Sequence, residues 1–321
     1  MRALGLVAAL AAAAPLAAQT QVLVVSGLGG EARYQESFVA TALAVARAAR
    51  ERLGVNPNEV VVLAEDTTRA LGIAGRSTRD GIAARLEALA RRAAPQALLL
   101  VVLVGHGSAT GGEPRLNLPG PDLTATGLAG LLDRFPTQLI VVVNTASASG
   151  DWIRALSGPR RAVITATRSG VERDETHFGQ HFADALTSDD ADRDKDGRLS
   201  VYEAFEYARR EVERGYQRDQ RLQTEHALLE ADGDQVGARA PDLMAGDGAA
   251  AAAIFLDGGR VPTPAGATPT GLTAARDSLQ REVVLLRGRK DTMAATEYDR
   301  RLEDLLVELA RVNRALRGTA R

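Results

Sequence analysis

Five short runs in the first half of the chain consist almost entirely of apolar residues. None of them alternates between apolar and polar positions, and each is rich in valine, leucine or isoleucine. Such runs are typical of strands that are buried on both faces of a parallel sheet. The five runs are Gln21–Ser26, Val60–Ala64, Leu98–Val104, Leu139–Val143 and Ala162–Ala166. A sixth run, Ala251–Leu256, is predicted to complete the sheet.

Helical patterns separate these runs. Ser37–Leu53 and Arg79–Arg92 carry apolar residues at the spacing of an amphipathic helix. Helices are also expected at Phe178–Leu186 and Val201–Tyr216. Strands that alternate with helices predict a layered α/β domain with right-handed crossovers.

The C-terminal part of the chain has a different pattern. Residues 258–271 are rich in proline and glycine and are interpreted as a linker. Beyond them, Leu272–Arg287 and Thr296–Arg317 have helical periodicity, which predicts a helical hairpin within 272–318. The hairpin either packs on the main domain, the preferred interpretation, or mediates oligomerisation by pairing with a second chain.

The first 18 residues have the pattern of a secretory signal peptide. Arg2 precedes an alanine-rich apolar run that ends in small residues near Ala18. The run is too short for a membrane anchor and contains Pro15. We therefore expect an exported protein, periplasmic or extracellular, with no membrane span in the mature chain.

Composition excludes several classes of chemistry. The chain has no cysteine, so it can contain neither a disulfide nor a catalytic thiol. The 39 basic and 41 acidic residues are interspersed and give a net charge of −2, which does not indicate a nucleic-acid partner.

Residues 192–203 match the twelve-residue EF-hand calcium loop. Carboxylates, a turn glycine and a closing glutamate occupy the expected positions, and Leu199 supplies the apolar anchor. The expected ligands are Asp192, Asp194, Asp196, the backbone carbonyl of Arg198, Ser200 and Glu203. The predicted cofactor is Ca²⁺, bound weakly and in a structural role, with Kd on the order of 10⁻⁴–10⁻³ M.

EF-hands normally occur in pairs, and only a fragment of a second loop is present. Asp232-Gly233-Asp234 lies within Glu230–Gly237 but has no closing glutamate. We interpret it as a turn, with an ion site as the alternative.

Two predicted strands end in residues that can perform chemistry. Leu98–Val104 leads directly into Gly105-His106-Gly107, and Leu139–Val143 leads into the small, hydroxylated segment 144–150. A histidine and a serine at adjacent strand ends form a plausible catalytic dyad.

This pair of strand ends resembles the caspase and legumain-like cysteine peptidases. Their strands end in His-Gly and in an acidic residue, Ala, Cys, one further residue and Ser-Gly. His106-Gly107 matches the first motif, and residues 145–150 match the second, with Ser147 in the place of cysteine. The resemblance implies a caspase-like three-layer sandwich over residues 19–257. It also implies an oxyanion hole formed by the Gly107 and Ser147 N–H groups.

The serine changes what this site is expected to do. A serine hydroxyl needs a well-placed base, whereas a thiol is intrinsically nucleophilic. No residue is identifiable as a partner that would orient His106, although Asp122 and Asp133 are near it in sequence. The preferred hypothesis is a catalytically silent module that binds a peptide or protein ligand or acts as a scaffold. The alternative is a hydrolase that uses a Ser147–His106 dyad, with Ser149 as a less favoured nucleophile.

Overall fold

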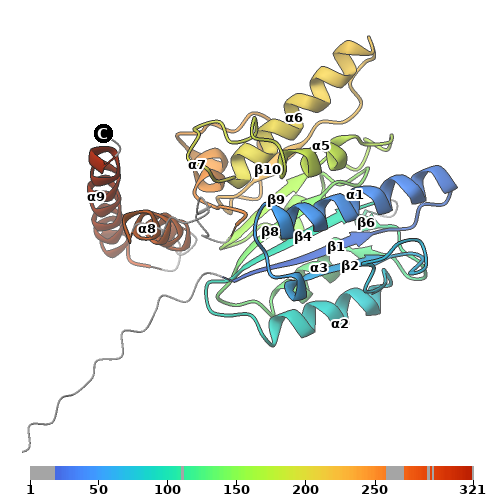
Figure 1. Cartoon of the computed structure of the whole chain (residues 1–321), viewed down its shortest axis with the longest axis horizontal. Coiled ribbons are helices and arrows are strands. Elements are labelled where there is room, and N and C mark those ends of the chain that lie inside the picture. Colours follow the sequence, from blue (N-terminus) through green and yellow to red (C-terminus); the bar gives the residue numbers. More distant parts are fainter. Residues whose placement is uncertain (1–18, 110–111, 258–270, 288–289, 291–292, 320–321) are drawn as a thin grey trace, which may run out of the picture.

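The computed structural model describes residues 19–109, 112–257, 271–287, 290 and 293–319. The predicted signal peptide and nearly all of the predicted linker lie outside these ranges. At the centre is a seven-stranded sheet with the strand order β10-β9-β8-β4-β1-β2-β3 (Figure 1). The chain thus forms a mixed α/β fold around a mostly parallel sheet.

All five predicted strands in the first half are confirmed. They are parallel to their neighbours, and only β10, at the edge of the sheet, runs antiparallel to β9. The strands are β1 (Thr20–Ser26), β2 (Val60–Ala64), β3 (Gly75–Arg76), β4 (Leu98–Val104), β8 (Leu139–Asn144), β9 (Arg161–Thr165) and β10 (Leu228–Glu230). A short 3₁₀ helix, Pro57–Glu59, precedes β2.

Helices cover both faces of this sheet and form three layers (Figure 1). Side chains alternate between the two faces along each strand, so that Val22 and Val24 face one layer while Leu23 and Val25 face the other. One layer contains α1 (Ala32–Glu51), α5 (Phe178–Ala185), α6 (Val201–Arg218) and α7 (Gly246–Ala252). The opposite layer contains α2 (Arg79–Ala90), α3 (Ala125–Leu132) and α4 (Trp152–Leu156).

The predicted strand at Ala251–Leu256 is wrong. The alanines of this run form the end of helix α7, and beyond it only Phe255 makes an isolated bridge, to Ser200. Alanine has the highest helix propensity of all residues, and this preference outweighs the apolar character that suggested a strand. Strand β10, which was not predicted, completes the sheet instead.

A small antiparallel sheet lies beyond the end of β4. It consists of β5 (Gly107–Ser108), β6 (Arg115–Leu116) and β7 (Leu123–Thr124). Because β5 begins at Gly107, this sheet holds the backbone that directly follows His106.

The predicted C-terminal hairpin forms as two helices, α8 (Gly271–Arg287) and α9 (Ala295–Thr319), which pack against each other. Val283, Leu286, Tyr298 and Val312 are among its buried side chains. An ion pair between Arg276 on α8 and Asp196 links the hairpin to the 192–203 loop. None of the helices in the described ranges has the length and apolarity needed to cross a membrane.

Candidate functional site

The ends of β4 and β8 bring His106 and Ser147 to the same edge of the sheet. The two strands are parallel neighbours, and Leu103 on β4 pairs with Asn144 on β8. His106 lies three residues after Leu103, and Ser147 lies three residues after Asn144. The backbone N–H of Gly107 donates a hydrogen bond to Ser147 Oγ at 3.2 Å. The structure therefore joins the two motifs that the sequence placed at adjacent strand ends.

Gly107 lies so close to Ser147 that no larger residue fits. A Cβ atom at position 107 would lie 2.3 Å from the Ser147 carbonyl oxygen and 3.0 Å from the Arg115 carbonyl oxygen. Both neighbours are backbone atoms, which cannot rotate away as a side chain can. The glycine therefore permits the close approach of the two loops.

The turn that carries Ser147 has a strained backbone. Ala148 has φ of +53°, a left-handed conformation that costs a residue with a Cβ atom about 1–2 kcal/mol. The Ala148 N–H donates to the Glu172 carbonyl oxygen at 2.7 Å, which holds this conformation in place. Within the described ranges the neighbouring Ser147 N–H has no hydrogen-bond partner. One of the two expected oxyanion donors is thus available, whereas the other, the Gly107 N–H, is occupied by the serine hydroxyl.

His106 is held by aromatic rings. Its imidazole lies edge-on to Tyr34, with ring centroids 4.6 Å apart, and to Phe38, with centroids 4.9 Å apart. Burial lowers the pKa of His106 below its usual 6.5, against the opposing effects of Glu175 and Glu31. In the described part of the chain the ring forms no hydrogen bond, to Ser147 or to any other residue. The imidazole is therefore packed on helix α1, where burial disfavours its charged form.

The other sequence candidates at this edge have structural partners. The Asp122 carboxylate accepts the N–H of Leu118, and Asp133 forms an ion pair with Arg161, so neither orients His106. Ser149 is completely buried, and its hydroxyl lies 3.2 Å from Thr167 Oγ1. Tyr34 and Phe38 were not predicted as site residues. Their signal in the sequence is that they are aromatic residues four positions apart in the first helix.

The acidic loop at 192–203 gathers three carboxylates. Oxygen atoms of Asp192, Asp194 and Asp196 lie within 4.8 Å of one another. Gly197 has φ of +83° at the turn, and its N–H donates to Asp192 Oδ2 at 2.9 Å. Carboxylate oxygens are the ligands preferred by Ca²⁺, so the donor set fits the predicted ion.

Glu203 and Ser200 connect this loop to helix α6. The two residues form a capping box, in which Ser200 Oγ accepts the Glu203 N–H and Glu203 Oε2 accepts the Ser200 N–H. Glu203 Oε1 also accepts the Arg193 N–H at 2.9 Å, so the glutamate lies against the beginning of the loop.

Burial, together with the nearby negative charge of Asp194, raises the pKa of Asp196 to about 6. Arg276, 3.4 Å away on α8, opposes the shift. The concentration of negative charge in the loop favours a bound cation. Arg276 of the hairpin neutralises part of this charge through its ion pair with Asp196.

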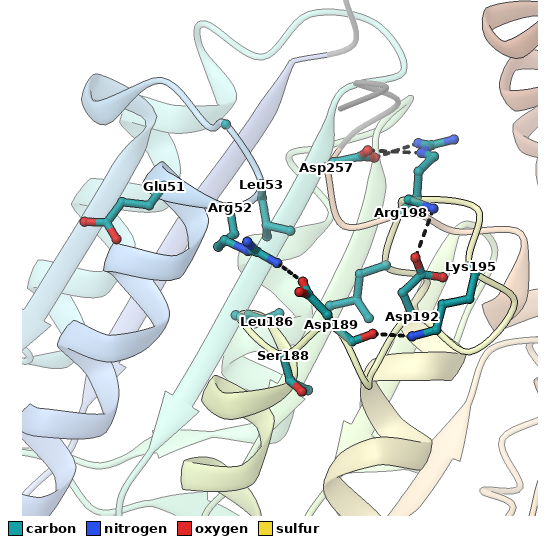
Figure 2. A pocket seen from close by; sticks show the side chains of 14 residues that line it. Glu51, Arg52, Leu53, Leu186, Ser188, Asp189, Asp192, Lys195, Arg198 and Asp257 are labelled. Carbon is teal, nitrogen blue, oxygen red and sulfur yellow. Dashed lines mark hydrogen bonds and ion pairs between the residues drawn. The ribbon is translucent and has the colours of Figure 1, made fainter. Parts of the chain in front are cut away.

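The side chain of Arg198 anchors the loop to a distant segment. It is almost completely buried, forms a two-pronged ion pair with Asp257 at 2.6 and 3.0 Å, and stacks over the Phe255 ring. Figure 2 shows this pair at one side of a cavity of about 610 Å³, with the exposed pair of Arg52 and Asp189 opposite. The sequence interpretation used only the Arg198 carbonyl and missed this role of the side chain.

No protein-family model matches the chain, and no curated protein sequence matches it.

Proposed function

We infer that this chain is an exported calcium-binding protein whose caspase/legumain-like domain is catalytically silent and serves as a binding or scaffolding module. The supporting observation is the bond from the Gly107 N–H to Ser147 Oγ. In a hydrolase this N–H would stabilise the oxyanion of the substrate, and the hydroxyl would be bonded to its base. Here the hydroxyl occupies the oxyanion donor, and His106 packs on aromatic rings.

The ligand of this module is proposed to be a peptide or a protein segment. Ser147 is almost completely buried. His106, Gly107 and Ser108, at the same edge of the sheet, are partly exposed. Among the described residues nothing accepts the Ser147 N–H, and a backbone donor of this kind is suited to a peptide carbonyl oxygen.

The second candidate is a hydrolase that uses a Ser147–His106 dyad. It is favoured by the strained turn at Ala148, because strained residues cluster at active sites. It requires the serine hydroxyl to rotate from the Gly107 N–H to the imidazole.

A fluorophosphonate probe separates these two functions because it reacts only with activated serines. For the wild-type protein we expect no adduct at Ser147 by mass spectrometry of peptides. A Ser147→Ala variant identifies background labelling, and Ser149→Ala tests the neighbouring hydroxyl. Labelling of Ser147 that disappears in His106→Ala would overturn the silent assignment in favour of the dyad.

A Ser147→Cys variant asks whether the rest of the site is competent. A thiol is a stronger nucleophile than a hydroxyl and depends less on a positioned base. We expect no cleavage of a mixed peptide library by this variant, because His106 remains bound to the rings of α1. Cleavage that is lost in Ser147→Cys/His106→Ala would contradict a silent architecture and show that only the nucleophile is missing.

A further inference from the structure

A second group of carboxylates lies at the end of β10, which is the edge strand on the other side of the sheet from β3. Glu230 is the last residue of β10, and Asp232 and Asp234 follow in the turn. Carboxylate oxygens of these three residues lie within 4.8 Å of one another. None of them belongs to the strand-end site or to the 192–203 loop.

A fourth carboxylate reaches this segment from another element. Asp247, in the first turn of α7, accepts the N–H of Ala231 at 2.7 Å and that of Asp232 at 3.3 Å. The sequence fragment had no closing glutamate within its own loop. Tertiary structure brings an acidic residue from α7 against the same stretch of backbone.

Glu230 is the unusual member of this group because it is completely buried. Its Oε1 accepts the Ser157 hydroxyl at 2.9 Å and the Gly233 N–H at 2.7 Å. Its Oε2 is buried and has no hydrogen-bond partner among the residues that the structure describes. A buried carboxylate oxygen that accepts nothing is costly, and a cation is the partner that would relieve that cost.

No positive side chain compensates this charge. Across the described ranges, none of the ion pairs formed by Arg, Lys or His involves Glu230, Asp232, Asp234 or Asp247. The 192–203 loop differs in this respect, because Arg276 pairs with Asp196 there. Close carboxylates in a partly buried setting require either protons or a bound cation.

We propose that Glu230, Asp232 and Asp234, together with Asp247, form a second binding site for a divalent cation, independent of the 192–203 loop. All of the side-chain donors are carboxylate oxygens, which selects hard ions and makes Ca²⁺ the expected occupant rather than Zn²⁺. The ion joins the end of β10 to α7 and so ties the antiparallel edge of the sheet to the helix layer.

Calcium stoichiometry tests this site directly. The purified full chain, stripped of metal, is dialysed to equilibrium against calcium up to about 10 mM, which covers the Kd range of weak extracellular sites. We expect two ions per chain for the wild type. The Asp232→Asn/Asp234→Asn variant is expected to bind one ion, as is the Asp192→Asn/Asp194→Asn variant, and the combined variant none.

The asparagine substitutions are chosen to preserve the fold. Asp232 and Asp234 are exposed, and each Oδ1 accepts a backbone N–H, from Asp234 and Val236 respectively. An asparagine Oδ1 accepts the same bond but carries no charge. Asp80→Asn/Asp219→Asn removes two exposed carboxylates elsewhere and is the matched control, with two ions expected.

The outcomes distinguish this site from the proposed EF-hand loop. Equal calcium binding by the wild type and Asp232→Asn/Asp234→Asn overturns the second site, whatever the loop variant does. One ion in the wild type that is lost only in Asp232→Asn/Asp234→Asn supports the second site and contradicts calcium binding by the loop. If Asp232→Asn/Asp234→Asn misfolds, the Asp192→Asn/Asp194→Asn variant decides. One calcium ion bound by that loop variant supports the second site, and no bound ion overturns it.

Discussion

The acidic loop and the strand-end site differ in how far apart along the chain their residues lie. All of the expected loop ligands fall within the twelve residues 192–203, and three of their carboxylates converge as the spacing predicts. The strand-end site joins His106 to Ser147 through the pairing of β4 with β8, and it adds Tyr34 and Phe38 from α1. A local motif thus specifies its own geometry, whereas a site assembled from strand ends acquires its chemistry from its neighbours.

The contrast has a limit, because the loop is anchored by distant residues. Arg198 pairs with Asp257, and Leu256 donates its backbone N–H to the Leu199 carbonyl oxygen at 3.0 Å. These contacts hold the acidic loop against the segment that contains Leu256 and Asp257. Four substitutions test which of the two regions depends more on tertiary contacts.

The largest effect is expected for Asp257→Ala. Removing one partner of this buried ion pair is expected to cost about 3–5 kcal/mol of unfolding free energy. Asp189→Ala breaks the exposed pair with Arg52 and is the control, with a loss below about 1 kcal/mol. Urea unfolding measures both. Equal losses for the two variants would mean that the loop is not anchored through Arg198.

Gly107→Ala is expected to cost about 3 kcal/mol, at the upper end of overpacking effects, because the new Cβ meets two carbonyl oxygens. Gly130→Ala is the matched control. Apart from its chain neighbours and its own helix backbone, no described atom lies within 4 Å of the Cβ position there, and replacing a helical glycine adds up to about 1 kcal/mol. In urea unfolding we expect Gly107→Ala to lower the unfolding free energy and Gly130→Ala to raise it. A neutral Gly107→Ala variant would show that the two loops do not approach as closely as described.

Calcium binding to the loop, at a concentration about 10–100 times Kd, is expected to raise the unfolding free energy of the protein by about 1.4–2.7 kcal/mol. Asp192→Ala loses this increment because it removes the first carboxylate of the loop. Arg193→Ala keeps it, since only its backbone N–H contacts Glu203. Thermal unfolding with calcium and with chelator measures the difference. The same calcium response in wild type and Asp192→Ala would contradict a loop-bound ion.

The smallest effect concerns the protonation of His106. Burial lowers the pKa of His106 in the folded protein below 6.5, so the unfolded chain binds this proton more tightly than the folded protein does. The unfolding free energy is therefore expected to decrease as the pH falls below about 6.5. In Phe38→Leu we expect the pKa, measured by NMR titration, to move back toward 6.5. Phe178→Leu changes a buried aromatic that does not contact His106, and it should leave the pKa unchanged. Similar shifts in both variants would argue against ring contact as the cause.

Several elements could be predicted from sequence because their signals are local. The five predicted strands β1, β2, β4, β8 and β9 were found because each is a short run rich in valine, leucine or isoleucine, and Ser200 with Glu203 marks the beginning of α6. The run at Ala251–Leu256 was misassigned because alanine is both apolar and helix-forming. Strand β10 has three residues, too few to give a periodic pattern.

By itself, the sequence determined the parallel core, the position of the acidic loop and the placement of a histidine and a serine after two of the strands. Those features depend on residue type and on spacing over a few positions. Tertiary structure alone decided that Ser147 bonds to Gly107, that rings from α1 hold His106, and that Asp247 accepts the N–H groups of the two residues after Glu230. These contacts depend on strand order and on helix packing, which bring together residues that no local pattern relates.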